Sequence, residues 1–366
     1  MRITIVCGHF IPAMGYIEVH LAKAFAELGH RVTVVTSTVI PSYVSHLHSK
    51  YGDPPENVTI KRLKPYFSLG QVVKAKGVRL AVIESKPDRI LVIGLGKAFP
   101  KPALGLGIHT TVLLGDNSAS YGDSPSAKTR LLFELFKRAT YQRAIKEADR
   151  LVAYTPESFE AAGKMLGGKW ADKLSKQNDF ISLGFHPDEF FFDEGLRKEK
   201  RAELGYSEAD QVLITATRLR AEKNLELVIK AFAKANSDVK WLILGSTDDD
   251  YSRSFQKSLI EELSSDRFLL LPHQPREALN AFYNAADMAV FTTPAISIIE
   301  AMGTGLPLII PQSEVLSHLI VDGRQGYYYN HQIELRDLNP PTNRAELASF
   351  NFELFSWRGI TKKLLD

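Results

Sequence analysis

Hydrophobic and polar positions follow two alternating periods along the chain. Short apolar runs rich in β-branched residues, such as ITIVC at 3–7 and RVTVVTS at 31–37, are typical of buried strands. The first run precedes a stretch of helical period, with Leu21 and Phe25 on one face and Gly29 at its end. Further runs of the first half are RILVIG (89–94), TTVLLG (110–115) and RLVAYT (150–155). Repeated strand–helix order predicts a parallel sheet covered by helices on both faces.

A second series of the same kind follows a charged stretch. Its strands are predicted at QVLITAT (211–217), VKWLILG (239–245), MAVFTT (288–293) and PLIIP (307–311). We therefore expect an α/β protein of two doubly wound, Rossmann-like domains, at residues 1–183 and 184–351. Residues 352–366 are expected to pack back onto the first domain. Ligands of such sheets bind at the carboxyl ends of the strands, which for two facing domains means the cleft between them.

Composition narrows the class of protein. The chain has 366 residues, 45% of them hydrophobic, which suits two globular domains. A net charge of only +3 does not indicate a nucleic-acid partner. One cysteine, Cys7, fits a reducing compartment, and neither a signal peptide nor an apolar run long enough to span a membrane is evident. We expect a cytoplasmic protein, with the inner membrane face as an alternative location.

Two cations form the most informative candidate site. In TRLRAEKN (217–224), Arg218 and Lys223 lie between a strand end and the start of a helix. Free N–H groups and partial positive charge at a helix start, together with two cations, suit a phosphate or diphosphate. Two solvated loop cations are the alternative.

Two further positions bear on ligand binding. Glu300 is expected in the first turn of a helix whose apolar face includes Ile298, Ala301 and Met302. Its carboxylate would either stabilise the helix start or hold a diol such as a ribose. Gly15 precedes the first helix, where glycine allows a ligand to approach the backbone, unless it is an ordinary turn residue.

These elements, in this order, resemble the retaining GT-B glycosyltransferases of family 4, also called group 1. The resemblance rests on segments spread over nearly the whole chain. They are GYIE (15–18), EADRLVAYTPES (147–158), SLGFHPDEF (182–190), TRLRAEKN (217–224), LPHQPREALNAFYNAADMAVF (271–291), EAMGTGLPLI (300–309) and FSWRGITKKL (355–364).

The resemblance implies a role for each candidate residue. Arg218 and Lys223 would bind the donor diphosphate and Glu300 the ribose hydroxyls, while His273 would lie near the base. The backbone around Ala295, Ile296, Ser297 and Ile298 would approach the donor, as would Gly15 and Tyr16. Asp116 and His109 would lie near the reacting sugar. Electrostatic stabilisation of the leaving diphosphate would replace a catalytic metal, and no cofactor is expected.

The chain departs from the family pattern at the donor loop. The family has Glu-x₇-Glu, and Thr292 stands where the first glutamate is expected. Thr293, Pro294 and Ala295 replace Gly-Phe-Gly, and Pro294 has no N–H to offer a ligand. Tyr16 replaces the second glycine of the first loop.

Weaker signals have structural alternatives. GLGKAF (94–99) breaks the dinucleotide fingerprint at Phe99. Asp248 to Asp250 suit either a divalent metal or a solvated turn. Two basic, aromatic segments, 60–67 and 128–143, suit a membrane surface or a lipid-linked acceptor. The alternative is a solvated helix that packs its apolar face on the core, in the second segment Leu132, Leu135, Phe136 and Ala139.

The leading hypothesis is therefore a glycosyltransferase that moves a sugar from a UDP- or GDP-linked donor to a hydroxyl of a glycan, lipid-linked or small-molecule acceptor. Polysaccharide or glycoconjugate biosynthesis would be its setting. Two alternatives are a catalytically silent sugar-nucleotide-binding protein, suggested by Thr292, and a UDP-GlcNAc epimerase of the same fold.

Overall fold

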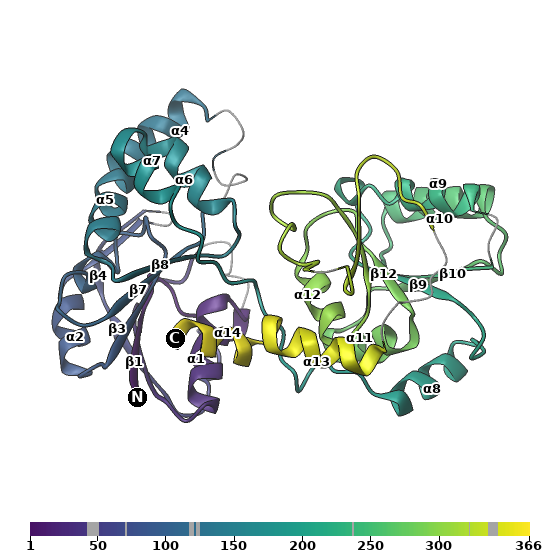
Figure 1. Ribbon diagram of the computed structural model, residues 1–366, viewed down its shortest axis with the longest axis horizontal. Helices are drawn as coiled ribbons and strands as arrows, with labels where there is room; N and C mark the ends of the chain where they lie inside the picture. Colours follow the sequence, from purple (N-terminus) through teal and green to yellow (C-terminus); the bar gives the residue numbers. More distant parts are fainter. Residues whose placement is uncertain are drawn as a thin grey trace. The chain divides into compact units, whose positions relative to one another are not determined.

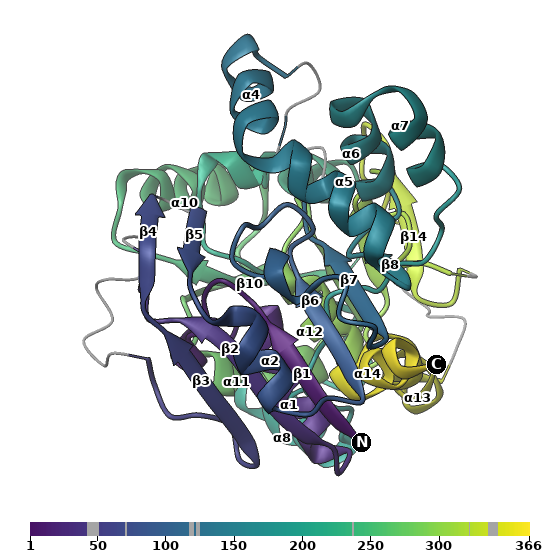
Figure 2. The same cartoon turned by 90° about the vertical axis from the view of Figure 1, so that its left-hand side faces the viewer.

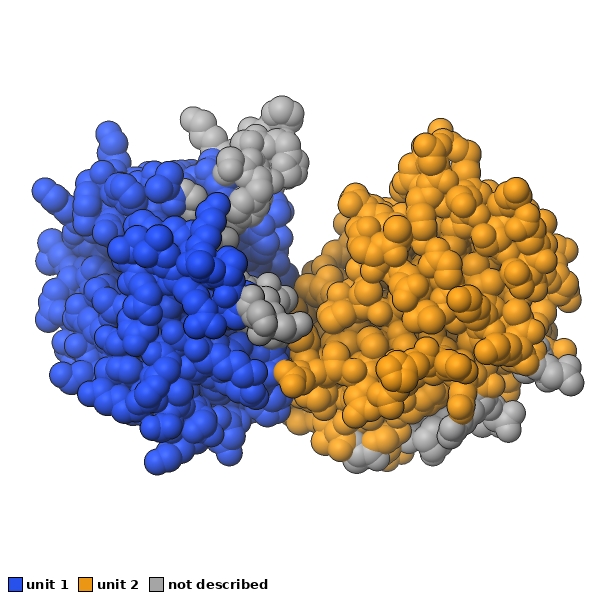
Figure 3. Space-filling view, turned by 90° about the horizontal axis from the view of Figure 1, so that it is seen from above, with its two compact units in different colours: residues 1–182, 361–366 blue, residues 183–360 orange. Residues whose placement is uncertain are grey.

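A computed structural model describes residues 1–41, 51–69, 72–116, 121, 125–235, 238–321, 323–335 and 343–366. These residues form two compact units, shown in different colours in Figure 3. The first unit comprises residues 1–182 and 361–366, and the second comprises residues 183–360. Thus only the last six residues, from the end of the final helix, group with the first unit, whereas 352–366 were expected there.

The first unit is built on a six-stranded parallel sheet (Figure 1), and its strand order, β3-β2-β1-β6-β7-β8, can be followed in Figure 2. Its strands are β1 (Arg2–Val6), β2 (Arg31–Ser37), β3 (Val58–Leu63), β6 (Arg89–Ile93), β7 (Thr110–Leu114) and β8 (Arg150–Ala153). Its helices are α1 (Ile17–Glu27), α2 (Val78–Glu84), α4 (Ala127–Leu132), α5 (Arg138–Glu147), α6 (Ser158–Leu166) and α7 (Gly168–Leu174), with short 3₁₀ turns η1 (Pro12–Met14) and η3 (Lys101–Ala103). The strand order reverses between β1 and β6, which makes the carboxyl ends of these two strands the expected ligand site.

The segment after β7 corrects one prediction. The face formed by Leu132, Leu135, Phe136 and Ala139 is exposed, not packed on the core. A π-helical turn, η4 (Phe133–Lys137), joins α4 to α5 and closes through the Arg138 N–H on the Phe133 carbonyl. Because a π turn contains an extra residue, it rotates the faces of the helix, and a regular period cannot predict which face is buried. Phe133 and Tyr141 are buried instead.

A separate hairpin lies beside this segment. Strands β4 (Pro65–Leu69) and β5 (Val72–Ala75) pair antiparallel, outside the six-stranded sheet (Figure 2). The basic, aromatic stretch 60–67 thus runs through β3 into β4. It forms strands and no helix.

The second unit has its own six-stranded parallel sheet, of order β11-β10-β9-β12-β13-β14. Its strands are β9 (Val212–Ala216), β10 (Lys240–Ser246), β11 (Phe268–Pro272), β12 (Met288–Val290), β13 (Leu308–Pro311) and β14 (Gly326–Tyr329). Its helices are α8 (Glu194–Glu203), α9 (Glu226–Lys234), α10 (Asp250–Glu262), α11 (Arg276–Ala285), α12 (Ile296–Gly303), α13 (Arg344–Phe355) and the first turn, residues 357–360, of α14 (Trp357–Leu365), with the 3₁₀ turn η5 (Ala221–Lys223). Here the order reverses between β9 and β12.

Both faces of this second sheet are buried. Val212 and Ile214 of β9 pack in one hydrophobic cluster, while Leu213 between them packs in another. Successive side chains of a strand point to opposite faces, so the two clusters lie on the two sides of the sheet. This burial explains why the strands appear in the sequence as continuous apolar runs.

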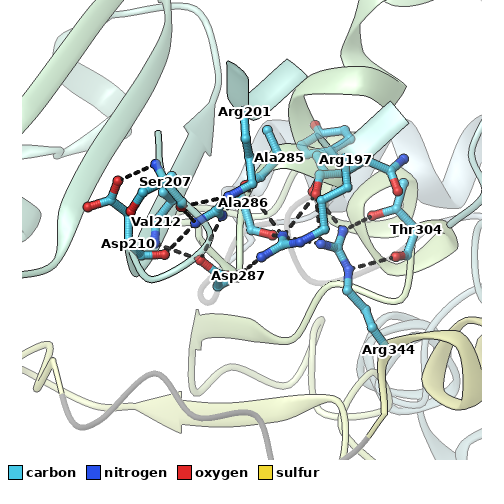
Figure 4. A network of polar contacts seen from close by, with 12 residues as sticks. Arg197, Arg201, Ser207, Asp210, Val212, Ala285, Ala286, Asp287, Thr304 and Arg344 are labelled. Carbon is cyan, nitrogen blue, oxygen red and sulfur yellow. Dashed lines mark hydrogen bonds and ion pairs between the residues drawn. The ribbon is translucent and has the colours of Figure 1, made fainter. Parts of the chain in front are cut away.

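Three arginines surround the end of α11 just before β12 (Figure 4). Asp287 accepts hydrogen bonds from Arg197 at 2.5 Å and from Arg201 at 3.3 Å. Arg344 donates to the carbonyls of residues 283, 284 and 286 at 2.6–2.9 Å. Burial, followed by the charge of Arg197, lowers the pKa of Arg344 to about 9. The network satisfies the helix-end carbonyls and fixes the start of the central strand β12.

Candidate functional site

The predicted diphosphate ligands lie where the strand order of the second unit reverses. Arg218 follows β9, and Lys223 ends the 3₁₀ turn η5 before α9. Arg218 is exposed, and within the described residues nothing forms an ion pair or hydrogen bond with its side chain. A cation held at this edge without a protein partner is available to an anionic ligand.

A glycine on the neighbouring strand fixes the loop that carries Arg218. Gly245 of β10 has φ +128°, and a Cβ there would lie 1.8 Å from the Thr217 carbonyl oxygen. Leu219 donates its N–H to the Gly245 carbonyl at 3.0 Å. Only glycine permits this approach, so the VKWLILG motif has a role that its apolar pattern did not indicate.

Thr292 and Thr293 connect the loop after β12 to Lys223. The Thr292 hydroxyl donates to the Lys223 carbonyl, and the Lys223 ammonium donates to the Thr293 hydroxyl at 3.1 Å. The loop that replaces the expected acid and glycines is thus bonded to the second predicted phosphate ligand. Because Thr293 is neutral, it leaves the charge of Lys223 uncompensated.

Glu300 lies in the second turn of α12, not in the first turn as predicted, because the helix begins at Ile296. It is 4% exposed, and one of its carboxylate oxygens pairs with Arg276 at 2.7 Å. Arg276 also bonds Glu189 at 3.0 Å and lies 5.1 Å from the centre of the Phe190 ring. Burial raises the pKa of Glu300 above its ordinary value, and Arg276 opposes that rise.

Arg276 is therefore a site residue that the sequence reasoning missed. It is the first residue of the REALNAFYNAAD helix, α11, and the sequence motifs had given it no ligand-binding role. It orients Glu300 and engages one of its oxygens. The other carboxylate oxygen can accept hydrogen bonds from a ligand.

The remaining donor-side predictions also map to the carboxyl edge of this sheet. His273 is exposed directly after β11, and its main-chain N–H donates to the Ser246 carbonyl at 3.1 Å. Ala295 is the N-cap of α12, with Ile296, Ser297 and Ile298 in its first turn, and no side chain caps this helix start. A helix start without a side-chain cap offers backbone N–H groups to an anion.

In the first unit, Asp116 is held by three donors at the carboxyl end of β7. Lys137 at 2.7 Å, Tyr121 at 2.7 Å and Tyr141 at 2.8 Å all donate to one of its oxygens. Burial would raise the pKa of Asp116, but the Lys137 ammonium and the two hydroxyls outweigh it and hold the pKa below its ordinary value. The carboxylate therefore stays charged.

His109 does not join Asp116. It is exposed at the amino end of β7, whereas Asp116 follows the other end, so about seven strand residues, or roughly 20 Å, separate them. The family resemblance implied that both lie near the reacting sugar, but the direction of the strand separates them. His109 lies outside the candidate site.

A different histidine lies at the point where the strand order of the first unit reverses. His9 follows β1 and Lys97 follows β6, and these strands are neighbours. Burial, together with the charge of Lys97, lowers the pKa of His9 to about 4. Within the described chain its buried Nε2 has no hydrogen-bond partner. Both residues were missed because finding them requires the strand order.

Gly15 and Tyr16 connect η1 to α1. Gly15 has φ +57°, in the left-handed region that favours glycine, and Tyr16 is the N-cap of α1. Glu18, the last residue of the GYIE motif, is buried in the first turn. Burial raises the pKa of Glu18 to about 7, partly offset by Lys97.

The three carboxylates of the acidic run 248–250 have partners within the protein. Asp248 and Asp250 pair with Arg253 at 2.5 and 2.7 Å, and Asp249 caps α10. Over the described ranges, no three His, Cys, Asp or Glu residues gather as metal ligands would. Nor is any helix in those ranges both long and apolar enough to cross a bilayer.

Comparison with known proteins gives consistent matches. Residues 197–335 match the family described as "Glycosyl transferases group 1". The chain is 27% identical over 245 residues to D-inositol 3-phosphate glycosyltransferase of Mycobacteroides abscessus, covering 65% of this chain and 49% of that protein. It is 21% identical to alpha-monoglucosyldiacylglycerol synthase of Acholeplasma laidlawii, covering 92% and 86%. The chain thus spans about half the length of the first of these relatives.

Solved structures share the architecture. Anabaena HepE in complex with UDP matches with a TM-score of 0.64 at 17% identity, over 100% of this chain and 98% of that one. The lipopolysaccharide outer core galactosyltransferase WaaB matches with a TM-score of 0.62 at 12% identity, over 100% and 98%. The chain has the GT-B fold, as the sequence predicted.

Proposed function

We propose that this chain is a retaining glycosyltransferase that uses a UDP- or GDP-linked sugar. The observation that carries the proposal is the pair Arg218 and Lys223 at the strand reversal of the second unit, with no acidic partner among the described residues. A nucleoside diphosphate supplies the negative charge that these two cations lack. The match to the group 1 family over the same region supports this donor chemistry.

The reaction exchanges one bond for another at the anomeric carbon. The bond from that carbon to the phosphate oxygen breaks, and an acceptor hydroxyl oxygen bonds to the carbon on the same face. The hydroxyl proton passes to the departing diphosphate. Arg218 and Lys223 stabilise the charge that develops on the leaving diphosphate, a type of stabilisation worth several kcal/mol in enzymes (about 3 for one donor). We propose that no catalytic metal takes part.

Other residues would select the nucleotide. The free oxygen of Glu300 would accept from the ribose hydroxyls, with Arg276 holding the carboxylate in place. His273 would lie beside the base. In the first unit, His9, Lys97 and the fixed Asp116 would face the acceptor hydroxyl, which belongs to a glycan, a lipid-linked or a small-molecule acceptor.

A panel of UDP-, GDP- and ADP-sugars tests the proposal, with transfer to added acceptors and slow donor hydrolysis as readouts. Transfer, or hydrolysis with the anomeric configuration kept, is the expected result. Binding of the nucleotide sugar without either reaction would indicate a silent sugar-nucleotide-binding protein. Release of UDP from UDP-GlcNAc with epimerised sugar would indicate an epimerase.

A further inference from the structure

The first unit exposes apolar side chains on two neighbouring elements. On α4 and η4 the exposed residues are Leu131, Leu132, Leu135 and Phe136, at 40–66%. On β4 they are Tyr66, Phe67 and Leu69, at 40–65%. Contiguous exposed apolar surface of this kind marks interaction sites in soluble proteins.

A cavity lies between these two elements. It has a volume of about 340 Å³, in the range of small-ligand pockets. Leu69 and Val72 of the hairpin and Leu132, Phe133 and Phe136 of the helix line it. Leu69, Leu132 and Phe136 thus form part of the cavity wall and part of the exposed apolar surface, whereas Phe133 lines the cavity from the core.

The polar lining of the cavity includes two cations beside the neutral Thr129 and Tyr121. Lys97 and Lys137 line it, and the ammonium of Lys137 lies 5.4 Å from the centre of the Tyr121 ring and pairs with Asp116. Further exposed cations belong to the same elements, Lys128 and Arg130 on α4 and Lys74 on β5. An apolar slot with ammonium groups at its side complements a molecule that has a hydrocarbon chain and an anionic head.

The π turn explains how one helix supplies both the core and this surface. It places Phe133 inward and leaves Leu132, Leu135 and Phe136 outward. Such turns recur at functional sites because they re-aim side chains at some cost in helix stability. Here the turn also brings Lys137, its last residue, to Asp116.

We propose that this cavity binds the hydrocarbon chain of a phosphate-bearing lipid, with the phosphate against Lys97 and Lys137. The exposed leucines and aromatics around it enter the bilayer surface. The lipid head then lies beside Asp116, which makes a lipid hydroxyl the acceptor. That last step rests on the proposed function, whereas binding of the lipid does not.

Two probes test the site in the full chain. Dodecyl phosphate, below its micelle concentration, reports on the cavity by calorimetry, and flotation with phosphatidylcholine vesicles, with or without phosphatidylglycerol, reports on the surface. Ala98 also lines the cavity, and Ala98→Phe fills it. Leu132→Trp is a second filling variant, at a 46% exposed position that tolerates a larger side chain.

Leu135→Glu tests the surface, with Ile260→Glu on α10 as its matched control, since the two residues are 66% and 64% exposed. We expect both filling variants to weaken dodecyl phosphate binding at least about tenfold, because each removes the burial of several methylenes. Leu135→Glu should no longer bind vesicles that contain phosphatidylglycerol, whereas Ile260→Glu should still bind them.

The proposal that the cavity binds a lipid chain would be contradicted if the wild type did not bind dodecyl phosphate, or if the filling variants bound it equally well. Equal vesicle binding by Leu135→Glu and Ile260→Glu would contradict the proposal that the exposed apolar residues enter the bilayer surface. Failure of nucleotide-sugar binding would leave both results standing and contradict only the proposed function.

Discussion

At the residue scale, Thr292 is the main departure from the resembled family, and the structure shows what the threonine does. Its hydroxyl bonds the main chain of Lys223, and the next residue, Thr293, bonds the Lys223 ammonium. The missing acid has therefore been replaced by a neutral connection between the two loops. Among the described residues, no carboxylate forms an ion pair with Arg218 or Lys223, the two proposed diphosphate ligands.

Thr292→Glu should change the reaction with the donor sugar more than the binding of UDP. A glutamate cannot donate to the Lys223 carbonyl, so the loop must shift, and its charge competes for the Lys223 ammonium. We expect kcat/KM for the donor sugar to change at least about tenfold, because one charge-assisted contact is worth 1.4 kcal/mol or more. UDP affinity should change less.

Thr292→Val is the matched control, since it removes the hydroxyl without adding charge. If Val and Glu variants keep wild-type kinetics with every sugar, residue 292 lies away from the donor. Sugar-dependent kinetics in the Glu variant alone would place the added charge at the sugar.

Glu18 gives the first unit a pH-dependent stability. Its pKa is raised from 4.5 to about 7 by burial, so the folded state binds the proton more tightly than the unfolded state. Stability from this group is present at low pH and is lost as pH rises from about 4.5 through 7, in all about 3 kcal/mol. Glu18→Gln should abolish this loss, as urea unfolding across the pH range would show.

The lowered pKa of His9 gives the stability a pH dependence of the opposite sign. The quantity to compare is therefore the difference in unfolding free energy between wild type and Glu18→Gln at each pH. The pKa of His9 is lowered to about 4, so its contribution is lost as pH falls from 6.5. The His9 contribution is present in both wild type and Glu18→Gln, so it cancels in their difference. Parallel stability curves for wild type and Glu18→Gln would show that Glu18 has an ordinary pKa.

At the element scale, apolar runs predicted nine of the twelve strands of the two sheets, but not the less buried edge strands β3, β11 and β14. The buried runs before Gly15 and before Arg218 predicted β1 and β9, because a strand covered on both faces must be apolar throughout. The helix after β7 was assigned the wrong inward face, since the π turn interrupts its period. Glu300 was placed one turn early because no side chain marks the start of α12.

The arginine network around Asp287 should be essential to the second unit. Removing the carboxylate leaves Arg201, whose side chain is 2% exposed, without its only charged partner among the described residues. Asp287→Ala should lower the free energy of unfolding by about 3 kcal/mol, as expected for a broken buried ion pair. Urea denaturation measures this loss.

Asp248→Ala is the control, because Asp248 pairs with Arg253 at a fully exposed position. Its removal should leave the unfolding midpoint unchanged. Equal effects of the two substitutions would mean that the network adds no more stability than a surface ion pair.

At the scale of the whole molecule, two parallel sheets each place their candidate residues where the strand order reverses. Arg218 and the loop at Thr292 follow the neighbours β9 and β12, while His9 and Lys97 follow the neighbours β1 and β6. The donor-side candidates were named from motifs that resemble a known family, and their roles stay predictions. His9, Lys97 and Arg276 could not be predicted, since only strand order and packing bring them to their sites.

The exposed apolar surface of the first unit can likewise be interpreted only from the folded molecule. Segments 60–67 and 128–143 were open to two interpretations from the sequence, a membrane or lipid surface and a helix packed on the core. The side chains at 132, 135 and 136 are exposed, which removes the second interpretation for that helix. The face that this helix buries depends on its π turn, and the composition of the segment does not reveal that turn.

The central claim is that Arg218 and Lys223 bind the diphosphate of a nucleotide sugar. Calorimetric titration of UDP-glucose and UDP into the wild type and into Arg218→Ala/Lys223→Ala tests it most directly, with Arg253→Ala as the control for lost charge. Two charge-assisted contacts are worth about 3–6 kcal/mol, so the double variant should lose at least about a hundredfold in affinity for both ligands. Wild-type affinity in the double variant would contradict the claim.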